Sequence, residues 1–122
     1  MKLAEVNALL CTEVLCGQEN MEREIVTACG ADLMSDVLVY TKEKTLLLTG
    51  LTNIQVVRTA EVGDLMGIIF VRGKRPGPEV IEMAKAKSIP LMLTELSMFD
   101  ACGILHDYGI RGCVERVPRN EL

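Results

Sequence analysis

The chain has 122 residues, and its 49% apolar side chains can supply one hydrophobic core but hardly two. Its net charge of −4 and its scarcity of aromatic residues argue against a nucleic-acid-binding protein, which needs a positive face and rings for base stacking. No apolar stretch near the start has the length of a signal peptide or a membrane span. We therefore expect a cytoplasmic protein without a membrane partner, folded as one domain over residues 1–122.

The first 44 residues alternate amphipathic and apolar segments. They predict, in order, a helix over 2–10, a strand over 13–16, a polar turn over 17–24, a strand over 25–29 and a helix over 32–40. Gly30 is expected to form the bend between the last two elements. Two to three strands are thus predicted before residue 45.

Three apolar runs follow at regular intervals: TLLLTG (45–50), GIIFVRG (67–73) and IPLMLTE (89–95). The steps from Thr45 to Ile68 and from Ile68 to Pro90 are 23 and 22 residues, about one strand plus one helix each. This pattern is typical of parallel strands joined by right-handed crossover helices. We predict an α/β fold with a mainly parallel sheet of about four to six strands flanked by helices. The tail between Gly112 and Pro118 is expected to add a short edge strand.

Helix signals fill the intervals between these runs. Asn53 predicts an N-cap for a helix that ends at Gly63, and Pro78 suits the first turn of a second helix that runs to about Lys87.

The third helix has the clearest signals. Ser97, with Asp100 three residues later, resembles a capping box, and Gly109 ends the helix. We expect its apolar face to be formed by Phe99, Cys102 and Leu105.

In an open parallel sheet, ligands bind outside the carboxyl ends of the strands, where loops and helix N-termini meet. The loops after the three apolar runs cover residues 49–53, 72–78 and 94–97. The middle loop is basic and glycine-rich and leads into a helix, a combination suited to an anionic metabolite or nucleotide. The candidate ligand-binding residues are Thr49, Gly50, Thr52, Asn53, Arg72, Gly73, Lys74, Arg75 and Thr94.

These polar residues also have local structural uses. Three basic residues in a surface loop are often simply solvated, and Ser, Thr and Asn cap helices or close turns without any ligand. We interpret Asn53 and Ser97 as caps. No GxxxxGK[ST] or GxGxxG motif follows a predicted strand, so nucleotide hydrolysis and dinucleotide redox chemistry have no motif support.

The five cysteines, at positions 11, 16, 29, 102 and 113, include no CxxC pair. In a reducing compartment such cysteines are by default small buried residues, so we predict no disulfide, and their spacing matches no ferredoxin pattern. Cys102 and the single histidine, His106, are four residues apart on one helix, which leaves open a Cys/His dyad or a metal site completed by Cys113. We favour a structural role for them, with no catalytic residue, metal or cofactor.

The seven methionines fall mainly on apolar faces, where methionine usually fills gaps in a core. Some are also available for a subunit contact. Because small α/β domains commonly pair through one exposed helix face, we predict a homodimer.

Four segments in this order resemble the DRTGG domain family: GADLMSDVLVY, LLLTGLTNIQ, GIIFVRGKRPGPEVIEMAKAKSIPLMLT and SMFDACGIL. The resemblance covers nearly the whole chain. Two parts of the resemblance are the most specific. One is a glycine with Ile-Gln a few residues after it, and the other is an apolar strand followed by a glycine loop and Pro-x-Pro-Glu. These are matched by Gly50, Ile54 and Gln55, and by Gly67, Gly73, Pro76, Pro78 and Glu79.

The resemblance implies a fold like the N-terminal domain of HPr kinase/phosphorylase, often dimeric and without assigned catalytic residues. Family members are modules of bacterial phosphotransacetylases and CBS-domain pyrophosphatases, or stand-alone proteins, some encoded near iron-only hydrogenases. The residues that name the family differ here: Leu51-Thr52 replaces Asp-Arg, and Val71-Arg72-Gly73 replaces Thr-Gly-Gly.

Together these observations predict a non-enzymatic regulatory, ligand-sensing or adaptor module. An alternative is a metal- or iron–sulfur-associated accessory protein for a redox enzyme such as a hydrogenase, as the cysteines and the family resemblance suggest. A small enzyme that uses Cys102 and His106 is a third hypothesis, which lacks a recognisable oxyanion-stabilising group.

Overall fold

A six-stranded sheet forms the centre of the computed structural model, which describes residues 1–113. The strands are β1 (Glu13–Cys16), β2 (Thr27–Gly30), β3 (Thr45–Thr49), β4 (Gly67–Phe70), β5 (Leu91–Leu93) and β6 (Arg111–Gly112). They lie in the order β1-β5-β4-β3-β2-β6, and only β1 is antiparallel to its neighbour. The predicted α/β fold with a mainly parallel sheet is confirmed.

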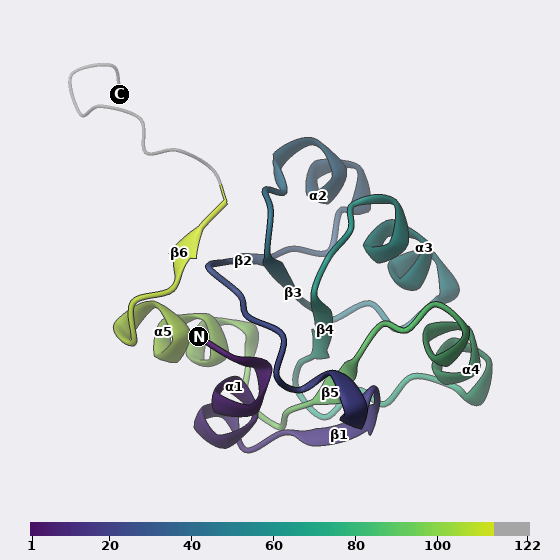
Figure 1. Cartoon of the computed structure of the whole chain (residues 1–122), viewed down its shortest axis with the longest axis horizontal. Helices are drawn as coiled ribbons and strands as arrows, with labels where there is room; N and C mark the ends of the chain where they lie inside the picture. The colour runs from purple at the N-terminus through teal and green to yellow at the C-terminus, as the bar shows by residue number, and fades with distance from the viewer. Residues whose placement is uncertain (114–122) are drawn as a thin grey trace.

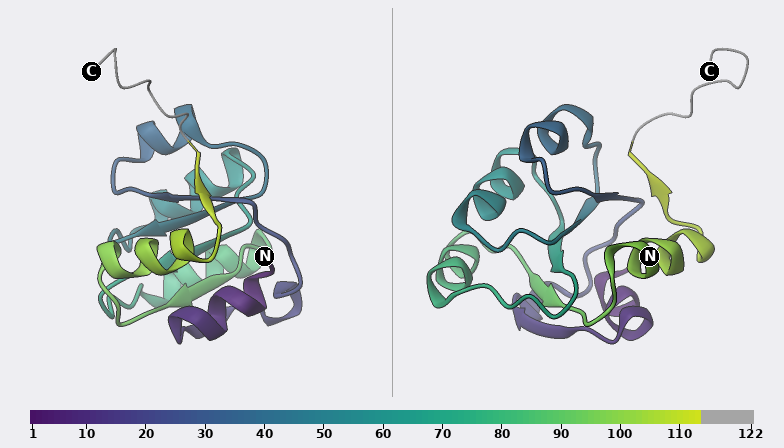
Figure 2. Two further views of the ribbon diagram at one scale, coloured as in Figure 1. Left: turned by 90° about the vertical axis from the view of Figure 1, so that its left-hand side faces the viewer. Right: turned by 180° about the vertical axis from the view of Figure 1, so that it is seen from behind.

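Helices cover both faces of this sheet (Figure 1). They are α1 (Leu3–Leu10), α2 (Met34–Tyr40), α3 (Ile54–Val62), α4 (Pro78–Ala86) and α5 (Met98–Asp107), with a short 3₁₀ helix, η1 (Gln18–Asn20), after β1. α2, α3 and α4 lie on one face, and α1 and α5 lie side by side on the other (Figure 2). The helices predicted over 53–63, 78–87 and 97–109 are each present.

Side chains of the central strands alternate between the two helical layers. Leu47, Ile68 and Phe70 pack with α2, α3 and α4, whereas Leu46 and Ile69 pack with α1 and α5. Every residue of β3 and β4 is buried, because parallel strands covered by helices on both faces have no solvent-facing side. This explains why these strands appear in the sequence as continuous apolar runs.

The chain around residue 30 differs from the prediction. β2 begins at Thr27 rather than at residue 25, and Gly30 is its last residue rather than a bend. The amide of Ala31 still donates to the carbonyl oxygen of Leu48, 3.0 Å away, so pairing with β3 continues past Gly30. The turn therefore falls later, and α2 begins at Met34 instead of at residue 32.

The helix starts follow the capping signals, but two predictions about the helices need correction. The Ser97 hydroxyl accepts a hydrogen bond from the Asp100 amide at 3.1 Å, and Pro78 is the first residue of α4. Asn53 occupies the N-cap position of α3, but its side chain makes no capping hydrogen bond. The predicted apolar face of α5 is wrong at Phe99, whose side chain is 85% exposed while Leu105 is buried.

Two remaining expectations concern a strand near the C-terminus and a membrane-spanning helix. The strand expected between Gly112 and Pro118 falls outside the described residues, although β6 forms just before it. Within residues 1–113, no helix has both the length and the apolar character needed to cross a membrane.

Candidate functional site

The β4–α4 and β5–α5 connections lie against each other at the carboxyl edge of the sheet. The Arg72 amide donates to the Leu96 carbonyl oxygen at 2.8 Å, and the Gly73 amide donates to the Thr94 carbonyl oxygen at 2.9 Å. Arg72 and Gly73 both have positive φ, 57° and 65°, so the backbone turns sharply here. The loops predicted to meet at this edge are therefore adjacent, but these two amides are already used within the fold.

Two of the predicted ligand-binding hydroxyls are buried structural groups. Thr94 Oγ1 donates to the Leu10 carbonyl oxygen at 2.8 Å and accepts from the Leu96 amide at 3.2 Å. Thr49 Oγ1 accepts from the Leu51 amide at 3.1 Å. Both threonines are fully buried, so their hydroxyls satisfy local backbone groups rather than face solvent.

Asp32, in the β2–α2 connection, is a residue of this edge that the sequence reasoning did not select. Its Oδ1 atom accepts hydrogen bonds from Thr49 Oγ1 at 3.0 Å and from the Gly50 amide at 2.8 Å. The signal that could have found it is the one used for the other loops, a polar residue directly after a parallel strand. The prediction instead placed Asp32 at the start of a helix.

A pocket of about 350 Å³ opens between these connections. Three of the predicted residues line it, Gly50, Arg72 and Lys74, and they are joined by Asp32, Val71, Ser97, Met98 and Phe99. We call this the carboxyl-edge pocket. It brings together parts of the connections that follow β2, β3, β4 and β5.

The carboxyl-edge pocket has positive side chains and one carboxylate. Arg72 and Lys74 are exposed, and within the described part of the chain neither has an ion-pair partner. Asp32 lines the same pocket, and its Oδ1 atom is held by the Thr49 and Gly50 donors. The first two amides of α5, those of Met98 and Phe99, have no acceptor within the helix because they precede its first turn. The pocket therefore offers more donors than acceptors.

Phe99 gives the pocket an aromatic wall. Its ring is 85% exposed at the first turn of α5, the largest exposed fraction among the large apolar side chains of residues 1–113. A ring this exposed buries little surface against the rest of the protein, so core packing does not explain its position. The sequence predicts Phe99 on the apolar face of this helix with Cys102 and Leu105, so its place in the site is not evident from the sequence.

The other predicted residues lie outside the pocket lining. Arg75 forms an ion pair with Glu13 of β1 at 2.5 Å, and this partner raises the pKa of the guanidinium. The Glu95 carboxylate lies against Gly73, where it would oppose an anion. Thr52 and Asn53 precede α3 and do not line the pocket.

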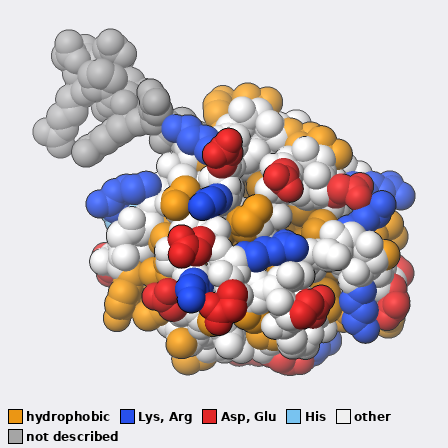
Figure 3. Space-filling model, viewed as in Figure 1, with side chains coloured by type: hydrophobic (Ala, Val, Ile, Leu, Met, Phe, Trp, Pro, Cys, Tyr) orange, Lys and Arg blue, Asp and Glu red, His pale blue; other side chains and the backbone are white. Residues whose placement is uncertain are grey.

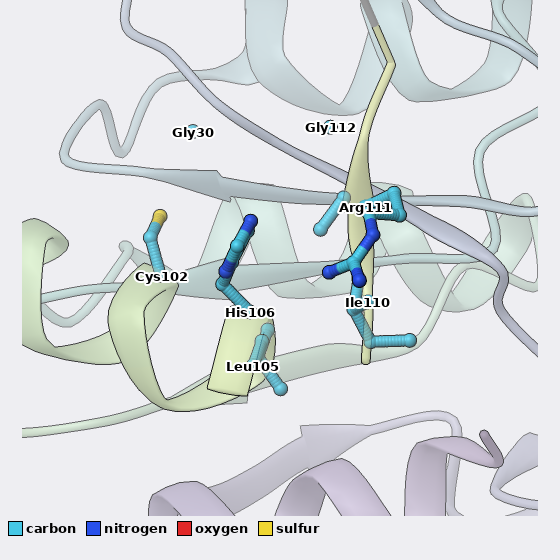
Figure 4. Close-up of a pocket in the computed structure, with 8 residues that line it drawn as sticks. Gly30, Cys102, Leu105, His106, Ile110, Arg111 and Gly112 are labelled. Atoms are coloured by element: carbon cyan, nitrogen blue, oxygen red, sulfur yellow. The ribbon is translucent and has the colours of Figure 1, made fainter. Parts of the chain in front are cut away.

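Cys102 and His106 line a second, smaller pocket between α5 and the β2–β6 edge (Figure 4). This space has a volume of about 180 Å³, and Gly30, Arg111 and Gly112 form much of the opposite wall. Cys113, the third member of the hypothetical metal set, is buried and lies beside Cys29 instead. Over residues 1–113, no three His, Cys, Asp or Glu side chains are grouped closely enough to hold a metal ion.

The thiol chemistry of this second pocket is that of neutral cysteine. Burial raises the pKa of Cys102, and its sulfur contacts the Met98 sulfur at 3.7 Å. A nucleophilic cysteine needs the opposite shift, toward the thiolate at neutral pH. The surroundings of Cys102 therefore favour a packed thiol over an activated one.

Comparison with known proteins agrees with this architecture. The sequence model of the DRTGG domain matches residues 5–108. A crystal structure of the CBS and DRTGG domains of the regulatory region of Clostridium perfringens pyrophosphatase, complexed with the activator diadenosine tetraphosphate, superposes with a TM-score of 0.71. The sequences are 18% identical, and the match covers 91% of this chain and 50% of that one, so the chain spans half of that structure. No curated protein matches the chain.

Proposed function

Because the chain belongs to the DRTGG domain family, we propose that it is a regulatory domain that binds a nucleotide-like anion in the carboxyl-edge pocket. The observation that carries this proposal is the position of the exposed Phe99 ring beside two cations without ion-pair partners in residues 1–113, Arg72 and Lys74. An aromatic ring next to basic side chains suits a ligand with both a base and phosphate groups. The role is one of binding rather than catalysis.

Each side of the pocket has a part in this recognition. Arg72 and Lys74 would contact phosphate oxygens, together with the open amides at the N-terminus of α5. Phe99 would stack on the base. The Asp32 carboxylate would repel a phosphate, but it can accept a hydrogen bond from a ribose hydroxyl, because Thr49 and Gly50 hold only its Oδ1 atom.

Two further findings support this class of ligand. The pocket lies outside the carboxyl ends of parallel strands, which is the usual place for ligands in open α/β sheets. The similar pyrophosphatase regulatory region was crystallised with a dinucleotide activator, although that structure contains CBS domains as well. Arg72 stands where the family typically has glycine, so this chain would contact its ligand through its own side chains.

Amide chemical-shift mapping by NMR tests where a nucleotide binds. ATP added to the uniformly labelled chain should shift the amides of Arg72, Lys74 and Phe99. The amides beside the groove between α3 and α4, such as that of Val62, should stay in place. Shifts confined to that groove or to the Cys102 pocket would contradict the proposal.

A second candidate function is self-association through the outer surface of α2, as a dimeric regulatory module requires. Exposed apolar side chains gather there and at the adjacent end of α3, as Figure 3 shows over α2: Leu33, Leu38, Val39, Tyr40 and Val62. Contiguous exposed apolar surface commonly marks an interface. An apolar patch can pair with its own copy around a two-fold axis without opposing like charges.

Sedimentation velocity with a charged substitution tests this second candidate. Val39→Asp should convert a dimer to a monomer, since a carboxylate would be buried without a partner. Tyr108→Asp is the matched control, because Tyr108 is also exposed but lies on α5's C-terminal side, on the other face of the sheet. A monomeric wild-type chain at high concentration, or a dimer unaffected by Val39→Asp, would rule it out.

A further inference from the structure

Two thiols meet at the edge of the sheet where β6 pairs with β2. The parallel register places Thr27 opposite Arg111 and Ala28 opposite Gly112. Cys29 is the next residue of β2 and Cys113 directly follows the end of β6, so the register brings these two cysteines side by side. The Cys113 thiol is close enough to Cys29 to raise its pKa. Neighbouring strands are about 4.8 Å apart, which lies within the span of roughly 4.4–6.8 Å that a disulfide bridges between Cα atoms.

The remaining cysteines are differently placed. Cys11 is exposed at the end of α1, and the buried Cys16 thiol donates to the Ile89 carbonyl oxygen at 3.5 Å. Cys102 lies against Gly30 on the α5 face of β2. Because side chains alternate along a strand, Cys29 points to the opposite face, where it packs with the α2–α4 layer. Cys113 is therefore the cysteine best placed to react with Cys29.

We propose that Cys29 and Cys113 are an oxidative modification site that forms a reversible disulfide between β2 and the residue that follows β6. The oxidant would be a small disulfide such as glutathione disulfide. The thiolate of Cys29, the more exposed of the two, attacks one sulfur of that molecule and releases one glutathione thiol. The Cys113 thiolate then attacks the mixed disulfide and releases the second, so two protons leave the protein and two electrons reduce the oxidant.

The surroundings of Cys29 set the rate of this reaction. Burial first, and then the neighbouring Cys113 thiol, raise the pKa of Cys29 to about 12. Only a small fraction of Cys29 is thiolate at neutral pH, so oxidation is slow there and accelerates as the pH rises. Sustained rather than brief exposure to a disulfide would form the link.

The bond would change the edge of the sheet and the pocket beside it. β6 contains two residues, and so short an edge strand is weakly held by its own hydrogen bonds. Arg111 and Gly112 of this strand also line the pocket that contains Cys102 and His106 (Figure 4). Oxidation would therefore fix one wall of that pocket against β2.

Peptide mapping of the 122-residue chain tests the proposal. The reduced protein is incubated with glutathione disulfide at pH 8, alkylated without reduction and digested with trypsin. We expect the peptide covering residues 24–42 to be linked to the peptide covering 112–116, with the loss of two hydrogen atoms, and dithiothreitol to separate them. Cys29→Ser and Cys113→Ser should each abolish the linked peptide.

Matched controls separate this site from the other thiols. Cys11→Ser and Cys102→Ser should leave the linked peptide unchanged. A link from either thiol to the Cys102 peptide, residues 88–111, would overturn the proposal. So would oxidation that yields only glutathione adducts or disulfides between molecules.

Discussion

The Asp32 carboxylate holds the end of β3 in place by accepting a hydrogen bond from the Thr49 hydroxyl, 3.0 Å away. The same oxygen accepts from the Gly50 amide at 2.8 Å, so one side chain joins the β2–α2 and β3–α3 connections. Both connections border the carboxyl-edge pocket, which makes Asp32 important for the shape of the proposed site as well as for stability.

Replacing Asp32 by Asn should therefore lower the free energy of unfolding. The variant loses the charge that strengthens two hydrogen bonds, and we expect a cost of about 1 kcal/mol because the side chain is partly solvated. Urea denaturation measures this cost. Asp64→Asn is the matched control, since Asp64 is exposed and Asn tolerates its φ of 53°. Equal unfolding midpoints for the two variants would contradict this role of Asp32.

The same substitution at two buried threonines should have different effects. Thr94→Val leaves the Leu10 carbonyl and the Leu96 amide without a partner, so we expect a loss of about 1–3 kcal/mol. Thr59 Oγ1 is buried without a hydrogen bond, so Thr59→Val should be neutral or stabilising. Urea denaturation of both variants gives the comparison. A loss at Thr59 as large as the loss at Thr94 would show that this hydrogen-bond assignment is wrong.

Much of the fold can be predicted from the sequence because its main signals are local. The runs 45–50, 67–73 and 89–95 are mainly apolar because the strands within them are covered on both faces. Ser97 and Pro78 mark helix starts by their own chemistry. Gly30 was misplaced because the end of β2 depends on pairing with β3, about 18 residues away, rather than on nearby residues. β6 likewise exists only through its pairing with β2.

The site could be predicted only in part. The rule that ligands bind at the carboxyl ends of parallel strands selected Gly50, Arg72 and Lys74, which do line one pocket. It could not distinguish these from Thr49 and Thr94, because whether a threonine is buried and hydrogen-bonded depends on the tertiary structure. Asp32 and Phe99 were missed, since an aspartate can start a helix and a phenylalanine is usually buried.

Stability should depend on pH above neutrality because of Cys29. Its pKa is raised to about 12, from an ordinary value near 9, so the folded chain keeps the thiol proton more tightly than the unfolded chain. This contribution is complete below about pH 9 and is lost as the pH rises toward 12. Under reducing conditions, the free energy of unfolding should fall less steeply between pH 8 and 10.5 for Cys29→Ala than for the wild type. Cys11→Ala, at an exposed site, should keep the wild-type slope; identical slopes for all three proteins would contradict this environment for Cys29.

The most direct measurement of the proposed function is a calorimetric titration of the chain with ATP, diadenosine tetraphosphate and tripolyphosphate. We predict saturable binding of both nucleotides. Phe99→Ala should weaken the binding of both nucleotides about tenfold or more, because it removes the stacking surface, but it should not change the affinity for tripolyphosphate. Arg72→Ala should weaken the binding of all three ligands. Tyr108→Ala and Arg58→Ala, which remove an exposed ring and an exposed cation elsewhere, should bind as the wild type does. The absence of saturable binding, or binding that neither Phe99→Ala nor Arg72→Ala weakens, would contradict the account.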